Sequence, residues 1–352
     1  MKVNNIVRIM AVTSGIKTPS SRFRIRQHIE QLRKYNLYVD EIIPPIDKNK
    51  SVPFLSKISP KYYIPLYIPW QIIKILQRLP VLLKQTRYKY IWLNRELLTG
   101  IPTLEVFFCK KIILDVDDAI WKNPPMGEIT ARFLAKKAYK IICGNNYLAE
   151  WFRRYNNNVY VIPTAVDVHK FIPRCNKRKD IVLGWIGTHG NLKYLEKIYP
   201  TLLKILNSNR NVYLNIVSDK RPEFCIDNSR ANYIEWSAED EVQNFQSIDI
   251  GLMPLDDNEW TRGKCSYKLL QHMACGSLVV GSPVGMNKEI LLEDNGAYPA
   301  NTENEWMDTL SYLISNFEEI YCIQSKKARR FIECEYSADT IREKLARVMI
   351  DD

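Results

Sequence analysis

The sequence lacks the features that mark several classes of protein. No run of eighteen apolar residues occurs, so no segment is predicted to span a membrane. The apolar start, Ile6 to Val12, is too short for a secretory signal and is predicted to be a strand. The eight cysteines show no CxxC spacing and no nearby histidine pair. This pattern argues against a zinc site and favours reduced thiols in a cytoplasmic protein.

Histidine is also scarce, and the histidines present give no catalytic constellation. Four occur, at positions 28, 169, 189 and 272, and no Ser–His–Asp or Cys–His arrangement can be argued from them. His272 is predicted to pack inside a helix. Asp115, Asp117 and Asp118 have a spacing that a metal could use, but no fourth ligand is evident. No metal is therefore expected.

Positive charge is in excess and is shared unevenly along the chain. The net charge of the 352 residues is +11. Residues 1–170 hold 28 Lys and Arg against 12 Asp and Glu, whereas residues 171–352 hold 22 against 27. This asymmetry suggests an anionic partner for the first half: nucleic acid, a membrane surface or a phosphorylated substrate. No nucleic-acid-binding motif accompanies the charge, so nucleic acid is the remotest of the three.

Short apolar runs alternate with helical patterns over the whole chain, which predicts doubly wound parallel sheets of the α/β class. The length suits two domains. A basic segment without pattern, residues 171–180, is predicted to link a domain at 1–170 to a domain at 181–336. Residues 337–352 are predicted to form a terminal helix. A single helix is predicted over Ser20–Tyr35.

The segment Asp249–Gly285 is the most informative part of the chain, and reads as strand, turn-rich polar loop, helix and strand. Lys264 and Lys268 lie at and just inside the predicted helix N-terminus, which Ser266 is expected to cap. Free helix amides, a positive dipole end and two ammonium groups together favour a phosphate or diphosphate. The alternative is a solvated basic helix start.

Ligands of parallel α/β sheets bind at the carboxyl ends of strands, and this rule selects further candidates. They are Ser14, Gly15 and Arg22 after the first strand, Asn94 and Arg95 after a later one, Asp117 and Asp118 after the next, and the loop Gly187, Thr188, His189 and Gly190. The glycine loop fails the spacing of a dinucleotide fingerprint, but could admit a phosphate or sugar. Consecutive aspartates are costly to desolvate unless they bind a ligand, act as acid or base, or pair with Arg95.

The stretch from residue 61 to residue 93 interleaves Tyr and Trp with Ile and Leu. Basic residues are spaced among them, namely Lys74, Arg78, Lys84, Arg87 and Lys89. This composition suits a helix lying at a membrane interface. The alternative is a buried helix pair with basic edges. The basic charge of the first half favours the membrane.

Seven segments, taken in order, carry a resemblance to a known family. They are SSRFR (20–24), LNRELL (93–98), LDVDDAIW (114–121), ICGNNYLAEWF (142–152), VIPTAVD (161–167), GWIGTHGNLKYL (184–195) and the segment 249–285. Their order and spacing resemble those of bacterial GT-B glycosyltransferases of the large retaining family four, the glycosyl transferases group 1, from surface-polysaccharide clusters. The resemblance covers nearly the whole chain. It implies two Rossmann-like domains facing a central cleft, with the last helix crossing back to the first domain.

The resemblance also implies an activity. The chain would be a hexosyltransferase that takes a sugar from a nucleotide-sugar donor, retains the anomeric configuration and needs no cofactor or metal. The C-terminal domain would bind the donor. The N-terminal domain would bind a glycan or polyprenol-linked acceptor of cell-surface polysaccharide or lipopolysaccharide synthesis, with the protein peripheral on the inner face of the membrane. A nucleotide-sugar epimerase or hydrolase on the same fold is the alternative.

The sequence departs from the family pattern at four positions. One is Asp117, which stands where a strand-end histidine is common in the acceptor domain. Gly263 and Gln271 stand where the family usually carries the two glutamates of an E-x7-E motif, and Thr188 stands where a loop arginine is usual. Gln271 could still hydrogen-bond a ribose hydroxyl, and Arg262, Lys264 or Lys268 would have to replace the arginine. The donor-binding residues implied are Gly187, Thr188, His189, Gly190, Arg262, Lys264, Lys268, Leu269 and Gln271. Those implied as catalytic are Asp117, Asp118, Lys264 and Lys268, with Ser14, Gly15, Arg22, Asn94 and Arg95 on the acceptor side.

Overall fold

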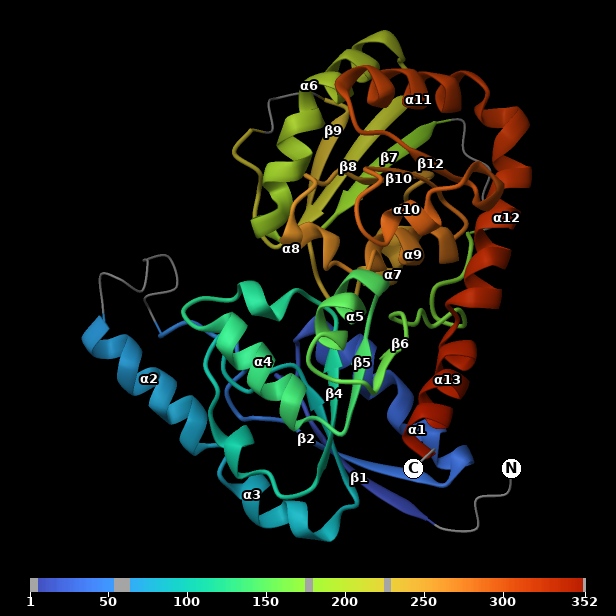
Figure 1. Ribbon diagram of the computed structural model, residues 1–352. Coiled ribbons are helices and arrows are strands. Elements are labelled where there is room, and N and C mark those ends of the chain that lie inside the picture. The colour runs from blue at the N-terminus through green and yellow to red at the C-terminus, as the bar shows by residue number, and fades with distance from the viewer. Residues whose placement is uncertain (1–5, 54–63, 175–179, 225–228, 351–352) are drawn as a thin grey trace. The chain divides into compact units, whose positions relative to one another are not determined.

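The computed structural model describes residues 6–53, 64–174, 180–224 and 229–350, which fold into two units (Figure 1). The first unit comprises Met1–Ala165 together with Ile341–Asp352, and the second comprises Val166–Thr340. Each unit contains a six-stranded sheet in which neighbouring strands are parallel. The predicted α/β class with doubly wound parallel sheets is confirmed. Half of the predicted linker, residues 175–179, lies outside the described residues.

The first sheet has the strand order β2-β1-β3-β4-β5-β6. Its strands are β1 (Val7–Val12), β2 (Leu37–Ile42), β3 (Tyr90–Asn94), β4 (Lys111–Val116), β5 (Lys140–Cys143) and β6 (Val159–Val161). Its helices are α1 (Ile29–Leu32), α2 (Ile64–Leu76), α3 (Pro80–Lys84), α4 (Gly127–Lys137) and α5 (Asn146–Arg153), and α13 (Ala338–Ile350) enters this unit at Ile341. The central strands are continuous apolar runs because both faces of a parallel sheet are covered, and β3 is buried at every position.

The single helix predicted over Ser20–Tyr35 is wrong. A π-helical turn, η1 (Ser21–Ile25), is followed by a 3-10 turn, η2 (Arg26–His28), then by α1 and a second 3-10 turn, η3 (Arg33–Tyr35). Buried hydrogen bonds from Ser21 and Arg24 to the ends of neighbouring strands hold the wider first turn. These tertiary contacts override the local helical pattern, as is common for π-helical turns at functional sites.

The second sheet has the strand order β12-β11-β10-β7-β8-β9. Its strands are β7 (Ile181–Ile186), β8 (Val212–Ser218), β9 (Ala231–Glu235), β10 (Ile250–Met253), β11 (Leu278–Gly281) and β12 (Ala297–Pro299). Its helices are α6 (Leu192–Ser208), α7 (Glu241–Gln246), α8 (Glu259–Arg262), α9 (Tyr267–Ala274), α10 (Asn287–Ile290), α11 (Glu303–Ser315) and α12 (Phe317–Glu335). If these six strands are renumbered 1 to 6 in chain order, the sheet has the order 6-5-4-1-2-3. Read from the opposite edge, this is the Rossmann order 3-2-1-4-5-6.

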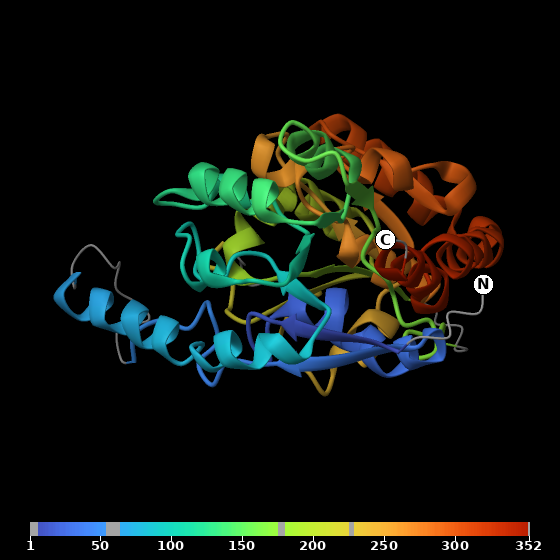
Figure 2. The ribbon, with the colours of Figure 1, turned by 60° about the horizontal axis from the view of Figure 1, so that its bottom comes forward.

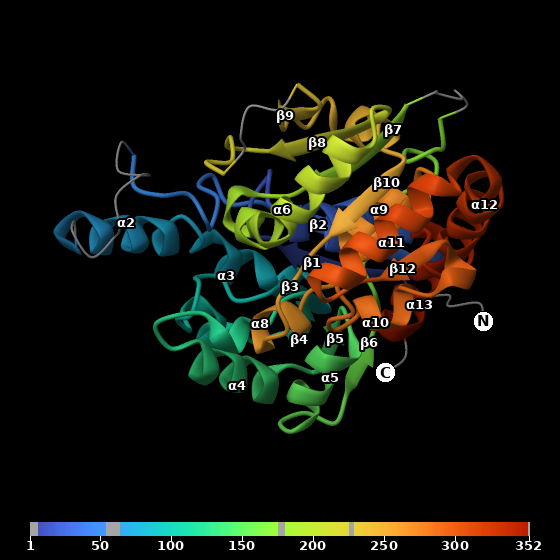
Figure 3. The ribbon, with the colours of Figure 1, turned by 90° about the horizontal axis from the view of Figure 1, so that it is seen from above.

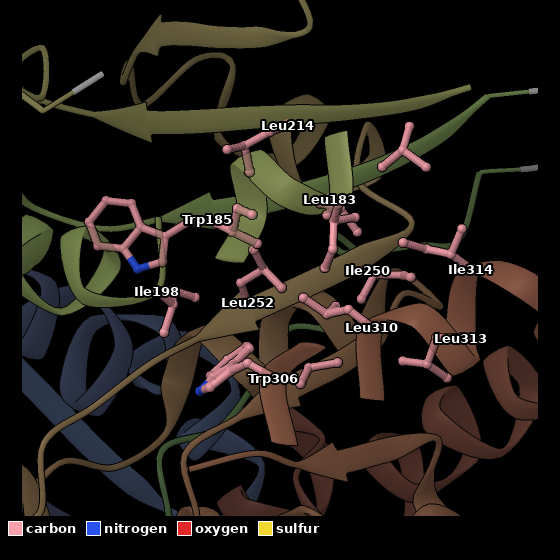
Figure 4. Close-up of a cluster of buried hydrophobic side chains, with 14 of the residues drawn as sticks. Leu183, Trp185, Ile198, Leu214, Ile250, Leu252, Trp306, Leu310, Leu313 and Ile314 are labelled. Atoms are coloured by element: carbon pink, nitrogen blue, oxygen red, sulfur yellow. The ribbon is translucent and has the colours of Figure 1, made fainter. Parts of the chain in front are cut away.

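The second sheet is covered on both faces by helices. Ile250 and Leu252 of β10 belong to an apolar cluster that also contains Ile198 of α6 and Trp306 of α11 (Figure 4). Figure 3 shows α6 and α11 lying along this sheet. Gly251, between the two cluster residues, faces the opposite way, because a Cβ added there would meet the ring of His272 in α9 at 2.4 Å. Alternation along the strand therefore places α9 on the face opposite α6 and α11.

Each sheet has one point where the chain changes the direction in which it adds strands. In the first unit this switch point lies between β1 and β3, and in the second it lies between β7 and β10. Connections leave such a neighbouring pair toward opposite faces, which opens a crevice outside the carboxyl ends of the two strands. The loops after β1, β3, β7 and β10 are therefore where ligands are expected. No helix within the described residues is long and apolar enough to cross a membrane.

Candidate functional sites of the two units

The glycine loop after β7 lies at the switch point of the second unit. The backbone N–H of Gly187 donates to the carbonyl of Val217 in the adjacent strand. A Cβ at Gly187 would lie 2.6 Å from the ring of Trp185, whereas a Cβ at Gly190 would meet nothing within 4 Å. Gly187 is thus required by close packing, and Gly190 faces open space at the start of α6.

His189 is clamped by a carboxylate that the sequence analysis missed. Asp219 accepts a hydrogen bond of 2.6 Å from the backbone N–H of His189 and contacts its ring Nδ1 at 2.6 Å. Burial favours the protonated acid, but the two hydrogen bonds from His189 outweigh it and hold the pKa of Asp219 below its ordinary value. Asp219 directly follows β8, so the strand-end rule could have found it. The clamp fixes the imidazole at the turn that leads into α6.

The N-terminus of α9 lies beyond β10, on the other side of the same switch point. Ser266 occupies the N-cap position, but the expectation that its side chain caps the helix is wrong. Its backbone is left-handed, with φ 51°, and its hydroxyl donates instead to Oδ1 of Asn287 at 2.6 Å. The amides of the first turn therefore receive no hydrogen bond from the side chain of Ser266.

Lys268 and Gln271 form a pair on α9. The ammonium of Lys268 donates to Oε1 of Gln271 at 3.1 Å and lies 5.1 Å from the centre of the Phe245 ring. Gln271 is fully buried, and its Nε2 has no hydrogen-bond partner among the described residues. Lys264 lies 5.9 Å from the centre of the Trp260 ring. Leu269 is fully buried, so it could offer a ligand only its backbone.

Arg262 lies in a loop that is more ordered than expected. The predicted turn-rich loop Asp256–Gly263 contains the one-turn helix α8, capped by the side chain of Asn258. Arg262 binds Asp257 with two hydrogen bonds, of 2.6 and 3.2 Å, and about half of each side chain is exposed. The hydrogen bond from Arg262 lowers the pKa of Asp257. Since this pair is exposed, a ligand phosphate could exchange with Asp257 at small cost.

Asn94 gathers three serines at the switch point of the first unit. Its Oδ1 accepts the hydroxyls of Ser20 at 3.2 Å and Ser21 at 3.0 Å, and its carbonyl lies 3.5 Å from the hydroxyl of Ser14. Ser21 also accepts the backbone N–H of Ser14. Nδ2 of Asn94 is buried and has no partner among the described residues. The structure thus brings together two of the residues predicted on the acceptor side, Ser14 and Asn94.

Beneath this network lies a fully buried ion pair. Arg24 binds Asp115 at 2.8 Å and also donates to the carbonyl of Ile162 at 2.7 Å. Trp92 donates its indole N–H to the other oxygen of Asp115. Burial raises the pKa of Asp115, and Arg24 opposes that rise. Sequence reasoning selected Arg22, which stacks on Phe23 at 4.6 Å, rather than Arg24.

Arg95 bridges the two consecutive aspartates that follow β4. Its guanidinium lies 2.5 Å from Asp117 and 2.6 Å from Asp118, so the pairing alternative from the sequence is what the structure contains. Burial favours the protonated form of Asp117, but Arg95 outweighs it and holds the pKa of this carboxyl below its ordinary value. Arg95 has a left-handed backbone, with φ 58°, a conformation found mostly where the surroundings enforce it.

Gly15 allows a second carboxylate to approach the loop after β1. Asp47 accepts the backbone N–H of Ile16 at 3.1 Å, and a Cβ at Gly15 would lie 2.3 Å from the Asp47 carboxyl. A larger residue at position 15 would therefore displace Asp47. Gly15 supports the shape of the loop, which is a structural reason for glycine at a position predicted on the acceptor side.

Neither unit brings together a set of metal ligands in its described part. No group of three or more His, Cys, Asp or Glu side chains that could hold a metal ion occurs among the described residues. The described cysteines are free thiols, and Cys175 and Cys225 lie outside the described residues.

Solved structures with this fold come from several bacteria. Sucrose-phosphate synthase of Thermosynechococcus elongatus matches with a TM-score of 0.69 at 13% identity, over 97% of this chain and 98% of that one. HepE of Anabaena, solved with UDP and glucose, gives 0.68 at 11% identity, over 98% and 99%. A glycosyltransferase of Rickettsia africae gives 0.64 at 12% identity, over 99% and 100%. No curated protein matches the chain in sequence.

These likenesses define the fold as that of the GT-B glycosyltransferases, two Rossmann-like units in one chain. The family named Glycosyl transferases group 1 matches residues 180–316, within the second unit. The chain is a glycosyltransferase with the GT-B fold, and the resemblance seen in its sequence motifs is confirmed at this level.

Proposed function

We propose that this glycosyltransferase transfers a hexose from a nucleotide-sugar donor to a glycan acceptor with retention of configuration. The observation that carries the donor assignment is the Rossmann order of the second sheet, whose switch point is flanked by the glycine loop after β7 and by the basic loop and helix after β10. Crevices of this kind bind nucleotides in open α/β sheets. HepE, which has the same fold, has been solved with UDP-glucose.

In the proposed donor site, Lys268 and Lys264 stabilise the diphosphate as negative charge develops on it during departure of the sugar. Arg262 gives up its hydrogen bonds to Asp257 and binds the phosphate instead. The backbone of Gly187 to Gly190 faces the phosphate side of the donor, where the N-terminus of α6 supplies a positive dipole end. Gln271, whose Nε2 has hydrogen-bonding capacity to spare, serves the ribose. No metal or cofactor takes part in this proposal.

The first unit is proposed to bind the acceptor at its own switch point. Ser14 and Asn94 offer hydroxyl and amide groups suited to sugar hydroxyls, and Arg22 and Gly15 belong to the same loop region. Arg95 holds the pKa of Asp117 below its ordinary value, so Asp117 is suited to accept a hydrogen bond from an acceptor hydroxyl rather than to donate one. Asp118 shares the same arginine.

The acceptor is proposed to be polyprenol-linked, in cell-surface polysaccharide synthesis, with the enzyme peripheral on the inner face of the cell membrane. Support comes from the basic balance of residues 1–170, which favours an anionic surface. Nucleic acid is not proposed as a partner.

Lys268→Met tests the donor site. Donor affinity, measured by calorimetry across UDP, GDP, dTDP and ADP sugars, should fall by roughly tenfold or more for the sugar nucleotide that binds best, since a charge-assisted contact is lost. Lys204→Met is the matched control, because Lys204 is exposed on α6 and pairs with Glu303 instead. Unchanged donor affinity in Lys268→Met would mean that Lys268 does not bind the donor.

A product assay distinguishes a transferase from a hydrolase. Release of free sugar at equal rates with and without acceptor would favour a hydrolase over a transferase.

A further inference from the structure

Polar side chains on one face of α2 bind the backbone of the rest of the first unit, and we call this face the polar stripe. Trp70 donates its indole N–H to the carbonyl of Lys50 at 3.1 Å, and Lys74 donates its ammonium to the carbonyl of Lys48 at 2.7 Å. One turn further, Gln77 exchanges two hydrogen bonds, of 2.8 and 3.0 Å, with the backbone of the same loop. Positions 70, 74 and 77 share one helix face, so polar groups fasten α2 to the loop after β2.

The outer face of α2 and of the following α3 is apolar. Ile68, Ile72 and Leu76 are exposed on the side of α2 away from the polar stripe, and Ile73 is exposed at the edge of that side. Leu66 and Tyr67 are exposed near the N-terminus of α2, and Leu79 and Leu83 are exposed after it, Leu83 at 81%. Figure 2 shows α2, in light blue, along the margin of the first unit. A surface helix normally buries its apolar stripe and exposes its charges. Because α2 does the reverse, an apolar partner is needed on its outer face.

This corrects the alternative interpretation of the segment as a buried helix pair with basic edges. Lys74 and Arg78 are buried, at 5% exposure each, whereas most of the large apolar residues of the two helices are exposed. Burial lowers the pKa of Lys74 to about 8, with Arg78 and Lys48 adding to the effect. The arrangement is costly for the isolated protein, which is consistent with a role for the outer face in binding.

The charge of the segment identifies the partner. Residues 48–95 contain ten Lys and Arg and no Asp or Glu. Lys84, Arg87 and Lys89 are exposed just beyond the apolar face. The partner must therefore be apolar and negatively charged, as a bilayer with anionic headgroups is. A second copy of the chain fits poorly, because it would bring the same positive segment to the contact.

The length of α2 distinguishes a helix that spans a bilayer from one that lies in its interface. The 13 residues of α2 extend over roughly 20 Å, which is too short for a hydrocarbon core of roughly 30 Å. An amphipathic helix of this kind lies in the plane of the interface with its apolar face in the headgroup–acyl boundary.

We infer that α2 and α3 form the membrane-docking element of this protein, inserted apolar face first into an anionic bilayer. The inference rests on the proposed function for its purpose, which is to reach a lipid-linked acceptor. Arg78 donates to the carbonyl of Thr13 at 3.1 Å, and the backbone N–H of Lys48 donates to the carbonyl of Ser14 at 2.8 Å. The docking element is thus fastened to the loop after β1, which belongs to the proposed acceptor side.

The test is co-flotation of the full chain with vesicles of phosphatidylglycerol and phosphatidylcholine. The double variant Ile72→Glu/Leu76→Glu should weaken binding to mixed vesicles at least tenfold, because two carboxylates would enter the boundary region. Ile129→Glu is the matched control, since Ile129 is 60% exposed on α4 of the same unit. Lys84→Gln and Arg87→Gln should each weaken binding to anionic vesicles by roughly fivefold, with little effect on neutral ones.

Equal flotation of wild type, the double variant and Ile129→Glu would overturn the inference. So would a concentration-dependent dimer in sedimentation that the double variant abolishes, because the face would then belong to a second copy. Donor affinity and transfer to a soluble acceptor should be the same in wild type and the double variant. Loss of docking with normal transfer supports the inference, whereas absence of transfer in wild type would count against the proposed function and leave the docking result standing.

Discussion

The two units have the same kind of sheet but handle charge at their switch points in opposite ways. In the first unit, Arg24 and Asp115 form an ion pair whose side chains are at most 2% exposed. In the second, Arg262 and Asp257 form an equally short pair whose side chains are about half exposed. Separating a buried pair leaves an uncompensated charge in a poor solvent, whereas separating an exposed one costs little.

This difference indicates how easily a ligand can replace the ion pair at each site. The buried charges of the first unit are held in the fold by one another, so the site is preorganised around the buried hydrogen-bond network of Asn94 and its serines. The charges of the second unit are held by contacts that water or a phosphate can replace. A site that must take up and release a diphosphate in every cycle is better served by the second arrangement.

The largest expected effect comes from breaking the buried pair. Asp115→Asn should destabilise the first unit by about 3 kcal/mol, because the guanidinium of Arg24 would be left buried beside a neutral amide. Asp257→Asn, the matched change in the second unit, should cost less than about 1 kcal/mol. Urea unfolding with hydrogen exchange at β4 and β10 reports the two units separately. Equal destabilisation by the two variants would contradict the comparison.

The sequence predicted the strands well and their order not at all. The strand predicted at Ile6–Val12 is β1 (Val7–Val12), because a buried parallel strand is a local apolar run. The order of strands depends on crossovers between distant segments, so the two switch points appeared only in the structure. Once the order of strands is known, the candidates after β1, β3 and β7 are seen to lie at the switch points of the two sheets.

The details of the sites were less accessible for identifiable reasons. Arg22 and Arg24 lie in one motif, and only the π-helical turn determines which of them is buried. Asp115 lies inside a strand and gives no strand-end signal. The composition of residues 61–93 indicated an interfacial helix, but which face of α2 points outward depends on backbone carbonyls of a loop 20 and 26 residues earlier.

Acidification should weaken both units to a similar extent, because each contains one buried histidine whose pKa is lowered. Burial lowers the pKa of His28 to about 3, helped by Arg342 and Arg24, and burial lowers the pKa of His272 to about 3, helped by Lys268. The unfolded chain binds a proton at each histidine below about pH 6.5. The stability that each neutral imidazole contributes is therefore present above pH 6.5 and lost as the pH falls toward 3.

At pH 5 the loss should be about 2 kcal/mol for each histidine. The measurement is the free energy of unfolding at pH 7 and pH 5 for wild type, His28→Gln and His272→Gln. Each variant should lose about 2 kcal/mol less than wild type between the two pH values. A pH dependence unchanged by both variants would mean that the imidazoles are charged in the folded protein.

A smaller effect is expected at the clamp on His189, which has no counterpart in the buried network of the first unit. His189→Asn keeps a hydrogen-bond donor near the position of Nδ1, and His189→Gln keeps one near Nε2. If the contact with Asp219 orients the donor loop, the asparagine variant should keep the KM for the donor within about twofold. The glutamine variant should raise that KM roughly tenfold, about 1.4 kcal/mol.

The opposite ranking would mean that Nε2 of His189 contacts the donor directly and that Asp219 is dispensable. Asp219→Ala separates the two roles further, since it removes the acceptor for both hydrogen bonds of His189 while leaving the imidazole in place. Its kcat should stay near that of wild type if the clamp serves binding alone.

The smallest effect distinguishes two glycines that look equivalent in the sequence. Gly187→Ala should cost about 1 kcal/mol of stability and weaken donor binding, because the new Cβ would press on the buried ring of Trp185 and shift the loop. Gly190→Ala should change stability by less than about 0.5 kcal/mol, since its Cβ would meet open space. Thermal unfolding and donor titration of both variants check this. If Gly190→Ala keeps its stability but loses donor affinity, the open space at Gly190 is where the donor lies, and the loop after β7 contacts its ligand at the N-terminus of α6 rather than at Gly187.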